Sequence, residues 1–183
     1  MRSDAERNRT EIVDAARRML VEDGDVTLSR VARQAGVGQG TLYRHFADRD
    51  ALIRAVYAAE IDDLARLALR SAAGGDPVAG LRTWLSRLAD YAVVKRGVMT
   101  AVSSSTWTEV SSETHGVLGE AVSALLGAGR AVGVVRDDVD ARDVILLTWF
   151  LTQVTPDERD SRVPRIIDVI VDGLRVGPAA TTL

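Results

Sequence analysis

The sequence predicts an all-α protein with a small N-terminal helical domain and a longer C-terminal one. Strand patterns are almost absent, the 183 residues include only four prolines, and apolar residues recur at spacings of three and four. Between Val26 and Leu52, two short helical patterns flank a turn that contains glycine, which is the layout of a helix-turn-helix. We expect residues 1–50 to form the helix-turn-helix domain and residues 51–183 to form a second helical domain.

The first two predicted helices are short and amphipathic. The first spans about residues 7–23 and would bury the apolar stripe Ile12, Ala16, Met19 and Leu20. The second follows Thr27, a natural N-cap. It ends at Gly36, because glycine readily takes the positive φ that closes a last helical turn.

The third predicted helix, at about residues 38–46, carries the polar surface of interest. Leu42 and Phe46, four residues apart, share one face and would enter the core. The rest of the helix surface is small, polar or aromatic: Gln39, Gly40, Thr41, Tyr43, Arg44 and His45. Such side chains suit the base edges and phosphates that border a DNA major groove.

The fourth and fifth predicted helices are longer and carry clear start signals. Asp48 would cap the fourth, whose apolar face is Leu52, Ile53, Val56, Tyr57 and Ile61. Asp76 and Pro77 read as the N-cap and first residue of the fifth. Its amphipathic stripe is Leu81, Trp84, Leu85, Leu88, Tyr91 and Ala92.

Helical signals weaken after residue 99. Nine of the fifteen residues from Thr100 to Thr114 are serine or threonine, so we expect an irregular segment there and a helix over about residues 113–128. Asp140 would cap a further helix that runs to Val154, and a last helix would follow Pro164.

The two final predicted helices are apolar nearly all round. Helices of this kind must be buried on every side, and a self-complementary two-fold interface would bury them. The predicted dimer interface consists of Leu147, Phe150, Leu151, Ile166, Ile170 and Leu174. The alternative is that both are central core helices of a single chain.

The N-terminal motifs resemble one family closely. The run from Gly40 to Phe46, followed by Asp48 to Leu52, resembles the signature of the TetR/AcrR family of transcriptional regulators, and so do Thr27 to Ala32 and the turn Ala35-Gly36-Val37. The resemblance covers roughly residues 5 to 60, and the C-terminal half resembles the SbtR-like class. It implies a homodimeric repressor that binds a palindromic double-stranded DNA operator and is released by a small-molecule effector bound in a C-terminal effector-binding and dimerisation domain.

The resemblance and the helix positions together predict nine DNA-contacting residues. They are Thr27, Ser29, Gln39, Gly40, Thr41, Tyr43, Arg44, His45 and Arg49. Gln39 is the best candidate for reading a base, since an amide pairs bidentately with adenine, and Gly40 permits close approach. The resemblance implies phosphate contacts for Thr27, Thr41, Tyr43 and Arg49. Ser29 has the alternative of a solvated helix residue, and His45 that of packing against the fourth helix.

The effector site is implied by the resemblance alone, as an apolar pocket with a few polar groups. Its predicted lining is Trp84, Leu88, Tyr91, Met99, Trp107, His115 and Trp149, which suits an apolar or aromatic molecule. We place Trp107 at the pocket mouth and consider Asp90, Arg96 and His115 as polar anchors. The stripe Trp84-Leu88-Tyr91 has the alternative of being core.

Charge supports localised DNA docking. The chain carries a net charge of −3, but four arginines and one acid lie between Val26 and Arg49. A modest basic patch on an acidic protein suits specific, salt-sensitive docking rather than general coating of nucleic acid. The alternative for these arginines is a solvated helix face.

Catalytic and membrane classes find no support. The two histidines lie seventy residues apart, and neither a Gly-x-Ser-x-Gly elbow nor a Walker-type loop occurs. We therefore expect no enzyme, no metal and no cofactor. No apolar run approaches the ~20 residues of a membrane span, no signal peptide is visible and cysteine is absent, so we expect a cytoplasmic protein without a membrane partner.

Two alternative functions stay open. The first is a regulator that responds to a protein or to no ligand, and the second is a helical enzyme or carrier.

Overall fold

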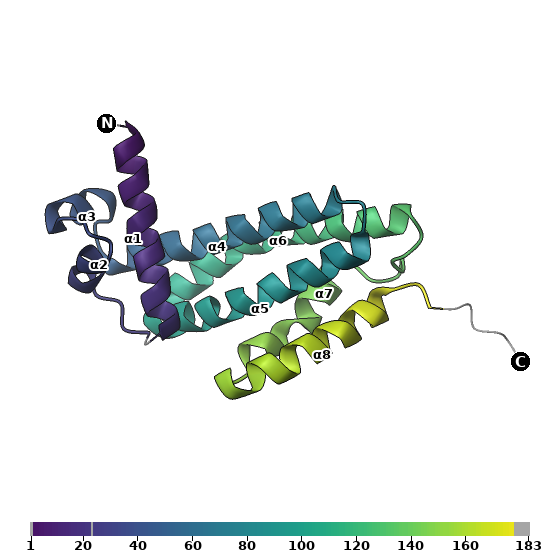
Figure 1. Cartoon of the computed structure of the whole chain (residues 1–183). Helices are drawn as coiled ribbons and strands as arrows, with labels where there is room; N and C mark the ends of the chain where they lie inside the picture. Colours follow the sequence, from purple (N-terminus) through teal and green to yellow (C-terminus); the bar gives the residue numbers. More distant parts are fainter. Residues whose placement is uncertain (1, 23, 178–183) are drawn as a thin grey trace, which may run out of the picture. The chain divides into compact units, whose positions relative to one another are not determined.

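The computed structural model describes residues 2–22 and 24–177, with the side chains of these residues other than 2, 3, 105 and 110–115. Its helices are α1 (Arg2–Glu22), α2 (Leu28–Gln34), α3 (Gln39–His45), α4 (Arg49–Ala72), α5 (Pro77–Ala101), α6 (Ser104–Ala131), α7 (Ala141–Leu147), the 3-10 turn η1 (Trp149–Thr152) and α8 (Pro156–Leu174) (Figure 1). One isolated β-bridge, Val135 with Arg175, is the non-helical pairing among these residues. The predicted all-α class is confirmed. Within the described residues, no helix has the length and apolar character needed to cross a membrane.

The chain packs as two units. The N-terminal unit comprises Met1–Glu60 and Val93–Thr114, and the C-terminal unit comprises Ile61–Ala92 and His115–Leu183. Packing thus groups the end of α5 and the start of α6 with the first three helices and the first half of α4. The predicted domain division at residue 50 follows the helix-turn-helix motif and stays a proposal.

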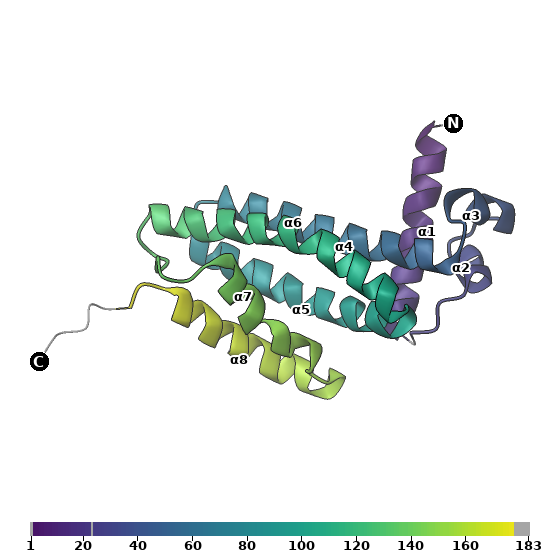
Figure 2. The ribbon, with the colours of Figure 1, turned by 180° about the vertical axis from the view of Figure 1, so that it is seen from behind.

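The N-terminal unit is built on α1, α2 and α3, which lie together in Figure 2. Its core includes the expected apolar residues of α1 and α3, together with two buried residues of α2: Ile12, Ala16, Met19, Leu20, Leu42 and Phe46, with Val31 and Ala32. Gly36 ends α2 with φ of +68°, a backbone conformation that side chains with a Cβ rarely adopt. The predicted turn chemistry is therefore confirmed.

Two contacts join α1 to α4 and α5 within this unit. Arg17 on α1 forms an ion pair with Glu60 on α4, whose side chain is almost fully buried. A Cβ at Gly97 on α5 would lie 2.7 Å from the carbonyl oxygen of Leu20, closer than van der Waals contact permits. Glycine at this position lets the backbones of α5 and α1 approach each other closely.

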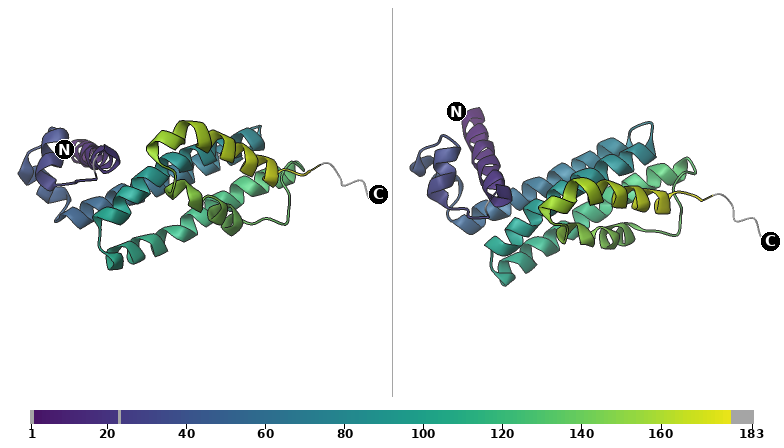
Figure 3. Two further views of the ribbon diagram at one scale, coloured as in Figure 1. Left: turned by 90° about the horizontal axis from the view of Figure 1, so that it is seen from below. Right: turned by 60° about the horizontal axis from the view of Figure 1, so that its bottom comes forward.

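The C-terminal unit is a bundle in which α5 and α8 run antiparallel, as Figure 3 shows. Ion pairs Arg82–Asp168 and Arg159–Asp90 join these two helices along their length. Trp84 is fully buried, and its Nε1–H donates to the carbonyl oxygen of Leu64 at 3.1 Å. A buried indole with a satisfied N–H is a core residue. The other large buried residues of this unit include Leu81, Leu85, Leu125, Leu126, Val144, Val171 and Leu174.

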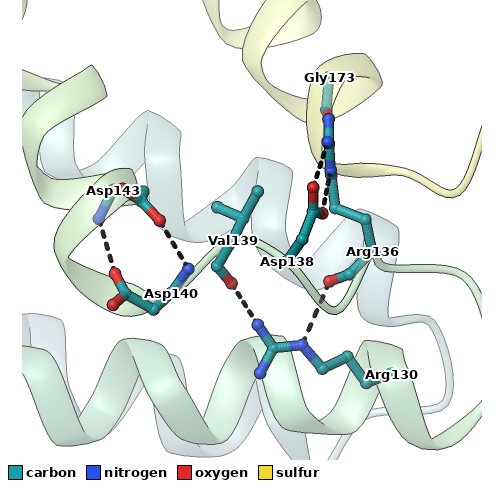
Figure 4. A network of polar contacts seen from close by, with 7 residues as sticks. All are labelled: Arg130, Arg136, Asp138, Val139, Asp140, Asp143 and Gly173. Atoms are coloured by element: carbon teal, nitrogen blue, oxygen red, sulfur yellow. Dashed lines mark hydrogen bonds and ion pairs between the residues drawn. The ribbon is translucent and has the colours of Figure 1, made fainter.

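The loop between α6 and α7 is fixed by arginine side chains (Figure 4). Arg130 donates to the carbonyl oxygens of Arg136 and Val139. Arg136 pairs with Asp138 at 2.6 Å and donates to the carbonyl oxygen of Gly173 at 3.3 Å, near the end of α8. The hydrogen bond and ion pair that Arg136 makes with Asp138 hold the pKa of the Asp138 carboxyl below its usual value. The network joins α6, the loop and α8.

The irregular segment expected between residues 100 and 114 was wrong. Helix α5 continues to Ala101 and α6 begins at Ser104. The Ser103 hydroxyl oxygen accepts from the Thr106 amide at 3.3 Å, and the Thr108 hydroxyl donates to the Ser104 carbonyl oxygen at 2.9 Å. Because these hydroxyls bond to the backbone of their own helical turn, they are compatible with a helix.

The predicted ends of the last two helices were also wrong. Helix α7 stops at Leu147 instead of continuing to Val154, and η1 follows. The Thr148 hydroxyl donates to the carbonyl oxygen of Ile145, three residues back, which favours the tighter turn. Helix α8 begins at Pro156, eight residues before Pro164, and contains Pro164 in its interior. Its exposed side carries charged groups that include Asp168 and Asp172, so α8 is amphipathic rather than apolar all round.

Candidate DNA-binding surface

Helix α3 presents the polar surface that the sequence predicted. Leu42 is buried, whereas Gln39, Gly40 and Arg44 are exposed and Tyr43 is 52% exposed. Nothing lies within 4 Å of where a Cβ of Gly40 would be, so the start of the helix offers open backbone to a ligand. Burial of Leu42 therefore leaves the opposite, polar face of α3 exposed.

The end of α3 is held by ring contacts and by hydrogen bonds within the helix. Arg44 donates from Nε to the Gly40 carbonyl oxygen and from Nη2 to the Thr41 hydroxyl, both at 3.1 Å. The half-buried His45 ring lies 6.4 Å from the Phe46 ring. Arg9 of α1 places its Cζ 5.5 Å from the centre of the same Phe46 ring, a cation–π distance. These contacts fix the Arg44 guanidinium and the His45 ring in place.

The start of α2 is exposed. Thr27 occupies the N-cap position, as predicted, but its side chain makes no capping hydrogen bond. Ser29, two residues on, is also exposed. Arg30 donates to the backbone and carboxylate of Asp25 at 2.9 and 3.0 Å, so part of the local positive charge is balanced.

Arg49 differs from the other predicted phosphate contacts. Its Nε donates to the carbonyl oxygen of Val26 at 2.7 Å, and its Nη1 donates to that of Ala101, the last residue of α5. The guanidinium is half-buried and links the loop before α2 to the end of α5. Sequence reasoning missed this link, since its two acceptors are backbone groups far away in the sequence.

A hollow of about 340 Å³ lies beside α3 and was also missed. It is lined by Asp4, Ala5, Asn8, Thr41, Arg44 and His45. The first three come from the opening turns of α1 and the others from α3. The predicted first helix started at residue 7, which left Asp4 and Ala5 out of the face that carries Asn8.

The residues predicted for a dimer interface divide into two groups. Leu151, Ile170 and Leu174 are buried within the single chain, whereas Leu147 is exposed and Phe150 and Ile166 are half-buried. Three further apolar side chains of the same elements are more than half exposed: Leu146, Trp149 and Val169.

The residues predicted for an effector site fall in both units. Trp84, Leu88 and Tyr91 are buried in the C-terminal unit, where Trp149 is exposed. Met99 and Trp107 belong to the N-terminal unit, and the side chain of His115 lies outside the described part of the chain. Of the proposed polar anchors, Asp90 pairs with Arg159 on α8 and Arg96 is half-buried.

Trp107 has a distinct environment. Its ring packs edge-on against Tyr57, with centroids 5.5 Å apart, and the Nζ of Lys95 lies 5.7 Å from the centre of the Trp107 ring. Burial lowers the pKa of Lys95 below its ordinary value. Trp107 thus joins α4, α5 and α6 within the N-terminal unit.

Comparison with known proteins agrees with these observations. Residues 12–56 match the family described as bacterial regulatory proteins of the tetR family, and residues 76–176 match the C-terminal domain of SbtR-like transcriptional regulators. A TetR transcriptional regulator of Streptomyces coelicolor is 35% identical, with a TM-score of 0.81 over 94% of this chain and 99% of that one. A TetR regulatory protein of Mycobacterium vanbaalenii is 29% identical, with a TM-score of 0.78 over 96% and 99%.

A curated relative matches only through the N-terminal region. An HTH-type transcriptional regulator of Staphylococcus aureus (strain USA300) is 39% identical over 64 residues, which are 34% of this chain and 35% of that protein. The match thus spans about a third of the curated relative's length. The family matches confirm the predicted resemblance and the expectation that the chain is no enzyme. The chain belongs to the TetR family of DNA-binding transcriptional regulators, with a C-terminal domain of the SbtR-like class.

Proposed function

We propose that this chain is a cytoplasmic repressor that binds a palindromic operator as a homodimer and leaves it when a small molecule binds. The observation that carries the DNA contact is α3, with Leu42 buried and Gln39, Gly40 and Tyr43 exposed. A recognition helix of this kind enters the major groove with its first residues at base edges. Gln39 would read a base, and the neighbouring hydroxyls, backbone amides and cations would hold phosphates.

The test uses Tyr43, which lies outside the core. Footprinting of the wild-type protein on the DNA upstream of its own gene would locate the operator, and gel shifts would give affinities. Removing a hydrogen bond to a charged phosphate costs about 1.5 kcal/mol per half-site, or roughly a hundredfold for two half-sites. We expect this loss for Tyr43→Phe and at least as much for Tyr43→Ala, with unchanged thermal unfolding. Equal affinity of both variants and wild type would remove Tyr43 from the interface.

Dimerisation through α7, η1 and α8 is supported by the exposed apolar group Leu146, Leu147, Trp149 and Val169. Helices α7 and α8 lie side by side within the C-terminal unit (Figure 1). A contiguous apolar patch on a surface is typical of an interface, and we propose that these exposed side chains form one, which a two-fold axis would let cover itself. A second copy of the chain is the occupant that a palindromic operator also requires.

Light scattering tests the dimer. Leu147→Arg places a charge on an exposed position, so we expect a folded monomer where wild type is a dimer. Val132→Arg, at another exposed apolar position, serves as the matched control and should stay dimeric. Ile170→Arg is less informative, because Ile170 is buried in the single chain and the charge would unfold it. A monomeric wild type at micromolar concentration would refute this interface.

Release by an effector is proposed for an apolar or aromatic molecule, with Trp107 as its reporter. The half-buried Trp107 contacts both Tyr57 and Lys95, so a ligand nearby would change its fluorescence. Linkage requires that this change and the loss of operator binding share one concentration range. A tenfold loss of operator affinity needs about 1.4 kcal/mol of coupling. A regulator without an effector would show neither change across a panel of such molecules.

A further inference from the structure

The hollow between α1 and α3 has a composition suited to a phosphodiester. Its α3 wall carries the Thr41 hydroxyl, the Arg44 guanidinium and the half-buried His45 ring. These groups supply hydroxyl, guanidinium and imidazole hydrogen-bond donors, which are common ligands of DNA phosphates. Arg44 is held over this wall by its 3.1 Å bonds to Gly40 and Thr41.

The α1 wall adds a neutral amide and a carboxylate. Asn8 is half-buried, and its side-chain amide can donate two hydrogen bonds. Asp4, one helical turn earlier, lies 3.6 Å from Arg7 and both side chains are largely exposed. The hollow therefore combines donors near α3 with one acidic group on the α1 side.

We propose that this hollow seats one phosphate of the operator backbone in each half-site, and that Asn8 of α1 contacts it together with Thr41 and His45. The inference rests on the proposed function and adds a helix outside the helix-turn-helix to the DNA interface. The flank of a helix in the major groove faces the backbone bordering that groove, and the lining of the hollow includes three residues of α3. Asp4 limits the affinity, because its carboxylate repels a phosphate in the hollow.

Phosphate ethylation interference gives the decisive measurement. The probe is a duplex that the wild-type protein selects from a random-sequence pool. Ethylation at the seated phosphate should block wild-type binding, and for Asn8→Ala this block should weaken at one phosphate per half-site while the blocks at the other phosphates are unchanged. Thr41→Val should weaken the block at the same phosphate, and the double variant should lose little more affinity than either single variant, because the two residues share one ligand.

Affinity measurements give the second readout. We expect Asn8→Ala to weaken binding about tenfold per half-site, as for a hydrogen bond to a charged group. Asn8→Asp keeps the side-chain shape and should weaken binding further, since it adds a carboxylate. Asp4→Asn should strengthen binding. Thr10→Ala is the matched control, because Thr10 is exposed on the same helix and its hydroxyl bonds to Glu6 of that helix.

The outcomes separate this inference from the function on which it rests. Loss of binding by Tyr43→Ala, with an unchanged ethylation pattern for both Asn8 variants, would overturn the α1 contact alone. A wild-type protein that retains no duplex would overturn both. Calorimetry with inorganic phosphate distinguishes free phosphate from the DNA backbone: saturable binding that the Asn8 variants abolish, without a change in ethylation pattern, would assign the hollow to the free anion and overturn the operator proposal.

Discussion

Helices α2 and α7 are each seven residues long and follow an N-cap residue with extended backbone, but their caps are used differently. At α7, the Asp140 carboxylate accepts from the Asp143 amide at 3.0 Å, and the Asp143 carboxylate accepts from the Asp140 amide at 2.8 Å. At α2, the exposed Thr27 side chain makes no capping bond. The Asp140 carboxylate in the C-terminal unit therefore stabilises its own helix, whereas the Thr27 side chain in the N-terminal unit is exposed at the start of its helix, where a ligand can reach it.

The same contrast extends over the surfaces of the two units. Around α3, exposed polar and aromatic groups surround the one buried residue of the helix, Leu42. Around α7, polar groups satisfy one another while Leu146, Leu147 and Trp149 are exposed. We infer that the N-terminal unit binds its partner through polar chemistry and that the C-terminal unit binds its partner through apolar area. The following predictions test this division, from the largest expected effect to the smallest.

Trp84→Ala should cost about 3–5 kcal/mol of unfolding free energy, as truncation of a large core residue does. The indole is fully buried and hydrogen-bonded to Leu64. Trp107→Ala, at a half-buried site, should cost clearly less and should alter any effector response more. Urea unfolding of both variants measures the costs. The reverse order would mean that Trp107 is the core residue and Trp84 the ligand contact.

Gly97→Ala should destabilise the protein by about 1–2 kcal/mol, because overpacking against the Leu20 carbonyl outweighs the helix propensity gained by alanine. Gly119→Ala is the matched control. Gly119 also lies inside a long helix, but nothing is within 4 Å of its added Cβ, so this variant should gain up to about 1 kcal/mol. Thermal unfolding compares the two, and a stabilised Gly97→Ala would show that α1 and α5 can move apart freely.

Asp140→Ala should cost about 1 kcal/mol, the usual value for a lost N-cap. Thr27→Ala should change stability much less, because no capping bond is lost, but should weaken operator binding. Chemical denaturation and gel shifts on both variants test this pair directly. Equal stability losses at the two positions would remove the contrast between the caps.

Lys95 should give a small pH-dependent effect. Its pKa is lowered by burial in the folded protein, so the unfolded chain binds more protons between that lowered pKa and the ordinary value of ~10.4. The unfolding free energy of wild type, relative to Lys95→Met, should therefore rise with pH through this window and stay constant below it. Urea unfolding at a series of alkaline pH values measures the difference. A difference that falls with rising pH would contradict the burial of the ammonium group.

The sequence by itself was sufficient to predict where several helices begin or end and which face of α3 is buried. Gly36, the Asp48 and Asp140 caps and the Leu42–Phe46 pair act through local geometry, so spacing and turn chemistry were sufficient to predict them. Local composition misled where hydroxyl groups bonded back into their own helices, as after Ser103 and at Thr148.

Only the tertiary structure decided how distant segments share one surface. The link from Arg49 to Ala101, the close approach of Gly97 to Leu20, and the hollow that joins Asn8 to Thr41 all connect residues far apart in the sequence. It also showed that Ile170 and Leu174 are buried while Leu147 and Trp149 are exposed. The sequence does not distinguish an apolar residue that is buried from one that is exposed on the same helix. Which face of the helix is buried depends on how the whole unit packs.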